Sequence, residues 1–258
     1  PMKILAIDTS AGPDSCAVVE AEQILAAASV NVRLTHSQTL MPMVEGMLNH
    51  AALSLEDIGL LAVSAGPGSF TGVRIGVAAV KGLAFPRDIP CTAVSTLAAI
   101  ARNWEGIPVP EELVICPVMD ARCRQVYTAR FLLGTDGSVS RQTPDRALTI
   151  DELQSELMPA KKTTILVGDG AELCYNTLKG LFDCRLAPPH LRYQQATGVA
   201  MEAAVMAQAG QAVPAGQLLP LYRTAVASLA PPAPGGTGTA GSRGNGGGLV
   251  LPVVRCTN

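Results

Sequence analysis

Several patterns that mark common classes of protein are missing from this sequence. No segment approaches 18 uninterrupted apolar residues, so we expect no membrane-spanning helix. The three histidines, His36, His50 and His190, show neither H-x-x-x-H nor H-E-x-x-H spacing, which argues against a metal-dependent hydrolase. There is also no G-x-S-x-G nucleophile elbow. We therefore expect neither a metal site nor a catalytic nucleophile.

Paired cysteines and clusters of charge are absent as well. The seven cysteines are scattered and never form C-x-x-C, which predicts free thiols in a reducing compartment. The 19 basic and 21 acidic residues give a net charge of −2 without a lysine or arginine cluster. Because nucleic-acid affinity rests largely on phosphate neutralisation, any RNA handling should need a partner. The N-terminal apolar run reaches Asp8 too early for a signal peptide, so we expect a cytoplasmic protein.

What the sequence does contain is enough apolar material for a substantial core. Of 258 residues, 48% are apolar and 16% charged. The end differs, because no acidic residue follows Glu202 and residues 231–248 are nearly all Pro, Gly, Ala, Ser and Thr. Such a composition cannot offset the entropy of ordering. We predict an N-terminal lobe at 1–105, a C-terminal lobe at 106–222 and a disordered tail at 223–258.

The same order of elements is predicted twice along the chain. Apolar runs and helical spacing give strand, strand, strand, helix, strand, helix in both lobes. The first set covers 3–7, 16–20, 24–32, 40–53, 60–64 and 71–85, with Thr39 as the cap that places Pro42 in the first helical turn. The second covers 113–119, 125–133, a strand around Val139, 151–158, 164–167 and 171–182, before a last helix at 195–208. This duplicated α/β order is similar to the actin, hexokinase and Hsp70 (ASKHA) superfamily, in which two lobes close on ATP.

The most distinctive stretch joins the strand at 60–64 to the helix at 71–85. Within that helix Gly72, Gly76 and Ala79 share one face, on which another backbone could approach closely. Two readings stay open, packing against the chain's own sheet and contact with another subunit. A phosphate cradle at 66–72 is a third, although it lacks the lysine of a Walker loop.

Three turns are candidates for nucleotide binding. Asp8 and Asp120 end the first strand of each lobe and could hold Mg²⁺ and phosphate oxygens. The later glycine-rich turn could let adenine approach the backbone. The alternative is that all three are ordinary turns, where Asp and Gly are common. The candidate residues are Asp8, Thr9, Ser10, Asp120, Gly168 and Gly170.

Six stretches together resemble the bacterial TsaB (YeaZ) family. They are residues 4–10, 36–42, 66–76, 94–97, 120–122 and 168–170, and the block at 66–76 is the most specific. The resemblance implies a non-catalytic paralogue of TsaD that supports threonylcarbamoylation of tRNA together with the ATPase TsaE. It implies a homodimer when the chain is alone, no cofactor of its own and ATP only at a complex interface. Leu40 stands where the catalytic paralogue has a second metal-binding histidine.

In this family the helices corresponding to 40–53 and 71–85 form the dimer contact. We therefore expect Gly76→Leu to abolish dimerisation while leaving the fold intact. The competing hypothesis is an ATP-dependent phosphoryl or carbamoyl transferase that uses Asp8 and Asp120. The predicted interface residues are Met41, Val44, Met47, Leu48, Gly72, Val73, Gly76, Ala79 and Val80.

Overall fold

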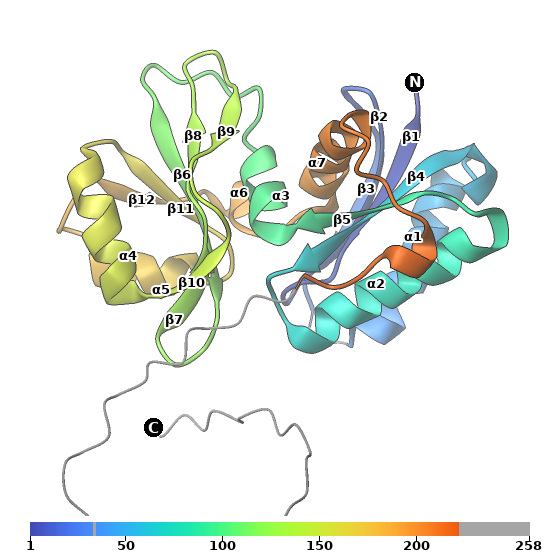
Figure 1. Ribbon diagram of the computed structural model, residues 1–258, viewed down its shortest axis with the longest axis horizontal. Helices are drawn as coiled ribbons and strands as arrows, with labels where there is room; N and C mark the ends of the chain where they lie inside the picture. Colours follow the sequence, from blue (N-terminus) through green and yellow to red (C-terminus); the bar gives the residue numbers. More distant parts are fainter. Residues whose placement is uncertain (33–34, 222–258) are drawn as a thin grey trace, which may run out of the picture. The chain divides into compact units, whose positions relative to one another are not determined.

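Two β-sheets, made in the same way from successive parts of the chain, form the framework of the protein (Figure 1). The structure is a computed structural model that describes residues 1–32 and 35–221. In the first sheet the strands lie in the order β3-β2-β1-β4-β5, antiparallel from β3 to β1 and parallel from β1 to β5. Their bounds are β1 Lys3–Asp8, β2 Asp14–Glu20, β3 Gln23–Val30, β4 Ile58–Gly66 and β5 Cys91–Ser95.

The second sheet repeats this arrangement. Its main path is β10-β7-β6-β11-β12, again antiparallel up to the central strand and parallel beyond it. Two further strands, β8 and β9, extend from β6. The bounds are β6 Leu113–Asp120, β7 Gln125–Thr128, β8 Phe131–Leu133, β9 Val139–Arg141, β10 Arg146–Thr149, β11 Thr164–Val167 and β12 Cys184–Leu186. The equal strand orders confirm the predicted duplicated, ASKHA-like α/β fold.

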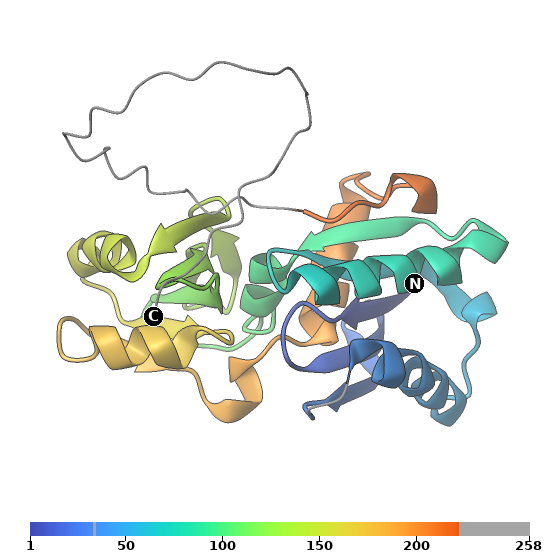
Figure 2. The same ribbon diagram turned by 90° about the horizontal axis from the view of Figure 1, so that it is seen from below.

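Helices cover both faces of each sheet (Figures 1 and 2). In the first sheet alternate residues face opposite sides, so Leu5 and Ile7 point to a core under α1 and α2, whereas Ile4 and Ala6 point to a core under α7. In the second sheet, α4 and α5 cover one face and α3 the other. The bounds are α1 His36–His50, α2 Phe70–Ala84, α3 Thr96–Arg102, α4 Ile150–Leu157, α5 Ala171–Leu178, α6 Pro189–Arg192 and α7 Ala196–Gln208.

The last helix does not belong to the sheet that precedes it in the chain. The sequence placed 195–208 in the C-terminal lobe, but α7 packs on the first sheet through Val199, Ala200 and Ala203. Beyond it, Val213 forms a bridge with Cys91, and the Leu221 N–H donates to the carbonyl of Ala65 at 2.6 Å. The predicted boundary at 106 is therefore wrong for 196–221, because the apolar back face of the first sheet needs a cover that residues 1–105 do not supply.

Several predicted elements have different bounds. The helix α1 begins at His36 after Thr35, so Pro42 lies inside it and not in its first turn. The predicted strand at 125–133 is broken into β7 and β8, which pair with different parts of β6. The strand around Val139 exists, but it pairs with β8; the place equivalent to β3 is taken by β10, which the sequence reading missed.

Five of the cysteines are free and buried, as predicted: Cys16, Cys91, Cys116, Cys174 and Cys184. The expectation was wrong for Cys123, which is disulfide-bonded. Cys256 and the predicted disordered tail at 223–258 lie outside the described residues. Across the described ranges, no helix has the length and apolar content needed to cross a bilayer.

Candidate functional site

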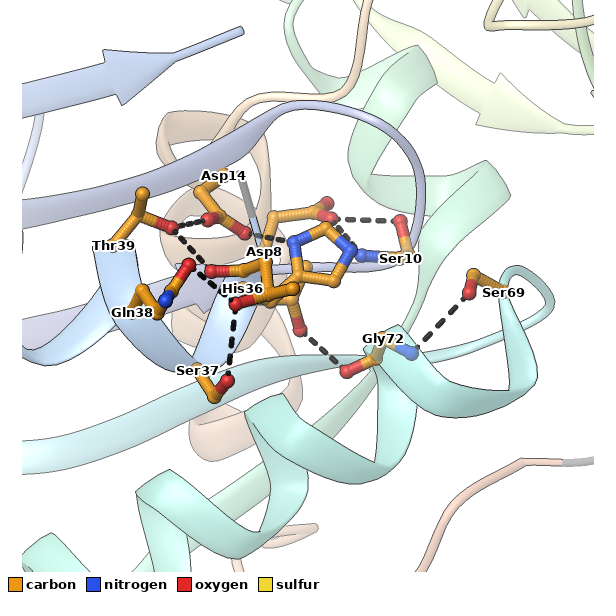
Figure 3. Close-up of polar contacts among 11 residues, drawn as sticks. Asp8, Ser10, Asp14, His36, Ser37, Gln38, Thr39, Ser69 and Gly72 are labelled. Atoms are coloured by element: carbon orange, nitrogen blue, oxygen red, sulfur yellow. Dashed lines mark hydrogen bonds and ion pairs between the residues drawn. The ribbon is translucent and has the colours of Figure 1, made fainter. Parts of the chain in front are cut away.

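The turn after β1 is held by a carboxylate whose oxygens are already occupied. Asp8 is 1% exposed. One of its carboxylate oxygens accepts from the backbone N–H and the hydroxyl of Ser10 at 2.8 and 2.7 Å, and the other accepts from the Ser64 hydroxyl on β4 (Figure 3). Burial raises the pKa of Asp8 against the opposing effect of these bonds. The carboxylate therefore fixes the ends of β1 and β4 to each other and is not presented to a ligand.

The glycines of α2 seat that helix against the same turn. A Cβ on Gly72 would lie 2.0 Å from the carbonyl oxygen of Thr9, and one on Gly76 would lie 2.5 Å from the Thr9 hydroxyl oxygen. That hydroxyl donates to the Gly72 carbonyl at 2.8 Å. The Ser69 hydroxyl caps the helix by accepting from the Gly72 N–H at 3.2 Å (Figure 3). The sequence left open whether the Gly72/Gly76 face of α2 packs on the chain's own sheet or on another subunit. In the structure it packs on the chain's own sheet.

The predicted interface is corrected accordingly. Gly72 and Gly76 are buried against Thr9, so Gly76→Leu would damage the fold and not a dimer alone. Five further members of the predicted set lie in the core between the first sheet and α1 and α2, and only two have surface to offer, since Met41 is 42% exposed and Ala79 is half-buried. The five core members are Val44, Met47, Leu48, Val73 and Val80.

The outward side of α2 carries the exposed side chains that the sequence reading missed. We call Phe70, Arg74 and Ala78, together with Phe85 directly after the helix, the outward face of α2. Phe70 is 58% exposed and Phe85 81% exposed, and the Arg74 guanidinium lies 3.6 Å from the centre of the Phe70 ring. The spacing i, i+4, i+8, with Phe85 at i+15, places these side chains opposite Gly72 and Gly76, a signal that was present in the sequence.

At the start of α1, His36 makes a polar contact within the protein. Its Nδ1 pairs with one carboxylate oxygen of Asp14, and the Thr39 hydroxyl donates to the other (Figure 3). Asp14 is 4% exposed, and it ties α1 to the start of β2. One turn on, Leu40 points into the core with 1% exposure, where a second metal-binding histidine would have to sit. Within 1–32 and 35–221 no group of three or more metal-ligating side chains is found.

The candidate residues of the second sheet meet at the carboxyl ends of β6 and β11. Gly168, with a φ of +109°, approaches the Val118 carbonyl so closely that a Cβ would lie 2.3 Å from it, and a Cβ on Gly170 would lie 3.1 Å from the Asp120 nitrogen. Asp120 is exposed and accepts from the Arg122 N–H at 2.7 Å. Although Asp169 is partly open to solvent, desolvation of its carboxylate, with a smaller contribution from Asp120, raises its pKa to about 6.

Comparisons with known proteins agree with this geometry. Residues 30–184 match the family model described as TsaD, tRNA N6-adenosine threonylcarbamoyltransferase. The tRNA threonylcarbamoyladenosine biosynthesis protein TsaB of Bacillus subtilis is 34% identical over 67% of this chain and 73% of its own length, and that of Escherichia coli is 33% identical over 66% and 72%.

Solved structures give the same result. A Pseudomonas aeruginosa protein described as similar to peptidase YEAZ superposes with a TM-score of 0.73 at 28% identity, covering 87% of this chain and all of that one. The structure described as YeaZ from the same organism gives 0.69 at 29% identity, covering 86% of this chain and all of that one. Two relatives above 30% identity that are matched over more than two thirds of their length establish the family, and this chain is a member of the TsaB (YeaZ) family.

Proposed function

We propose that this chain is a scaffold and activator in threonylcarbamoyladenosine biosynthesis on tRNA. The names of its relatives carry the assignment to that process, and the match to the TsaD model supports a paralogue of the transferase as its partner. In this proposal a TsaD-like subunit is catalytic, a TsaE-like ATPase assists, and all three work in the cytoplasm. The chain has no cofactor of its own, and any ATP sits at a complex interface. The tRNA is held by the partner, since a net charge of −2 offers little attraction for phosphates.

The outward face of α2, with Met41 of α1, is the surface we propose for the catalytic partner and for a homodimer when the chain is alone. Aromatic residues, methionine and arginine are the side chains enriched at protein interfaces. Here two exposed phenylalanines, one of them stacked under Arg74, provide rigid apolar anchors. The exposure of Phe85 is the single observation that carries this surface, because an 81% exposed phenylalanine at a helix end gains most from a partner.

The competing hypothesis, an ATP-dependent phosphoryl or carbamoyl transferase, needs Asp8 to hold magnesium and phosphate. The three hydrogen bonds that Asp8 accepts from Ser10 and Ser64 count against this use. Asp120 is exposed and keeps the hypothesis open to experiment for the second lobe.

Binding tests the surface. Phe85→Glu should weaken binding of a purified TsaD-like subunit at least about 30-fold, the effect of losing an interface anchor worth about 2 kcal/mol. The matched control is Leu173→Glu on α5, which places the same charge on another exposed apolar helical residue, 46% exposed. Equal weakening by both variants, or by neither, would contradict the proposed surface.

Reconstitution tests the function. Threonylcarbamoyladenosine formation is measured with the TsaD-like and TsaE-like subunits, with and without this chain, and with Asp8→Asn/Asp120→Ala. The proposal expects no product without the chain and restored activity with the doubly substituted variant. A folded, partner-bound variant that fails to restore activity would support the transferase, and full activity without the chain would refute any activating role.

A further inference from the structure

The outer strand of the first sheet has an edge that invites pairing. The strand β3 lies at the end of the sheet, and within the described ranges β2 is its only strand neighbour. Its eight residues, QILAAASV, include no charged residue and no proline. Proteins commonly protect such edges with lysine, proline or a covering segment, because the free N–H and C=O groups form a template for another strand.

Hollows border β3 on both faces of the sheet. Beside α1 a hollow of about 410 Å³ is lined by Leu25, Ala27 and His50. Beside α7 a larger one of about 800 Å³ has Ile24 and Val205 in its wall, and these are 52% and 48% exposed. A third, of about 320 Å³, lies where the end of β3 meets the start of α7. Since α1 and α7 cover opposite faces of the sheet, a strand added to β3 would place alternate side chains toward hollows on both sides.

The size of the side chains on β3 indicates what fits there. Its centre is Ala26, Ala27 and Ala28, and these small residues leave unfilled the hollow beside α1 and the one at the start of α7. A second copy of this chain, paired through its own β3, would bring the same alanines to these hollows and would fill little of their volume. Large apolar side chains at alternate positions of a different segment share one face, and on the α7 side they would fill the larger hollow and exclude water from Ile24 and Val205.

The charge beside one end of β3 adds a second requirement. The rim of the larger hollow carries Glu22, Glu105 and Asp136. Among the described residues that line it, the one cation is Arg102, which is already bonded to Glu105 at 2.6 Å and to Glu202 at 2.7 Å. The rim is therefore net negative where β3 begins, which favours a lysine or arginine on the occupant.

We propose that β3 accepts an extended segment of another protein as a sixth strand of the first sheet. The segment carries large apolar side chains at alternate positions and a lysine or arginine beside Glu22. The strand shares no residue with the outward face of α2, and the proposal assigns to it a partner other than the one bound there.

The test uses the full chain and a short fluorescent peptide that alternates valine and threonine between terminal lysines. The peptide should bind and should slow amide hydrogen exchange in β3. Two matched peptides separate the contributions. N-methylation of alternate amides removes strand pairing and should abolish binding, whereas terminal glutamates should weaken it about tenfold at low salt.

Two variants test the location. Ala27→Lys, at an exposed position in the middle of β3, should weaken binding at least about tenfold, and Glu22→Lys should weaken it less and reduce its salt dependence. Phe85→Glu should bind the peptide normally, which keeps this result independent of the proposed function. Equal binding of the N-methylated peptide, no protection of β3, or a homodimer by light scattering that Ala27→Lys dissociates would each overturn the proposal.

Discussion

The two sheets end their central strands in the same way but use the carboxylate there differently. Asp8 closes β1, is buried and accepts three hydrogen bonds from Ser10 and Ser64. Asp120 closes β6 at the equivalent place, is exposed and lies beside Asp169. The duplicated fold thus keeps an acidic residue at both positions, while the first has become part of the framework and the second stays open to solvent.

Backbone requirements, in contrast, are shared by the two halves. Gly66 ends β4 with a φ of +125° and Gly168 follows β11 with a φ of +109°. In each case a Cβ would lie at only about two thirds of a normal contact distance from a backbone oxygen, 2.4 Å from that of Leu221 and 2.3 Å from that of Val118. The backbone geometry of the strand-to-helix turn is therefore the same in both halves. The halves differ in the side chains around that turn, such as the buried Asp8 and the exposed Asp120.

The largest difference in stability between the halves should come from substituting the glycines near the start of the helices that follow these turns. Gly72→Ala places a Cβ 2.0 Å from the Thr9 carbonyl, whereas Gly170→Ala places one 3.1 Å from the Asp120 nitrogen. We expect Gly72→Ala to lower the free energy of unfolding by about 3 kcal/mol or to prevent folding, and Gly170→Ala to cost about 1 kcal/mol or less. Urea unfolding followed by circular dichroism measures both, and similar losses would mean that the two helices are seated alike.

A smaller effect should distinguish the two carboxylates. Asp8→Asn replaces an acceptor oxygen by an NH₂ group that faces donors, so we expect a loss of about 1 to 3 kcal/mol in the free energy of unfolding. Asp120→Asn, at an exposed position, should change it by less than about 0.5 kcal/mol. Equal effects in chemical denaturation would show that the first carboxylate does not carry the structural role assigned here.

The smallest effect concerns the response of the second half to pH. The pKa of the Asp169 carboxyl group is about 6 in the folded chain, against an ordinary value of 3.8. The folded state therefore binds this proton more tightly than the unfolded state does. The contribution of Asp169 to stability is therefore full below about pH 4 and is lost as the pH rises to about 6. Thermal unfolding between pH 4 and pH 7 should show wild type losing stability relative to Asp169→Asn, and less so in an Asp120→Asn background. A difference that stays constant with pH would rule out this titration.

Much of the framework could be predicted because local patterns agree with it. The strand at 60–64 and the helix at 71–85 both follow from short-range patterns, and the structure has β4 and α2 there. The strand β10 could not be found in this way, because Arg146–Thr149 is short and carries an arginine, and its pairing with β7 is a tertiary contact.

The candidate site was harder to predict than the fold. Small residues on one face of α2 showed that something comes close, but the sequence alone could not say whether that was Thr9 of the same chain or a second subunit. The same spacing that placed Gly72 and Gly76 together also placed Phe70, Arg74 and Phe85 on the opposite side, where their exposure is a property of the folded chain.

The position of α7 has a consequence for the order in which the chain is made. The apolar back face of the first sheet, with Ile4, Ala6 and Leu60, is complete early in translation, but its cover ends at Gln208. At a synthesis rate of about 5 to 20 residues per second, that face waits roughly 5 to 20 seconds for its helix. During this interval the nascent N-terminal half has an uncovered hydrophobic surface, and it is then a natural client for ribosome-associated chaperones.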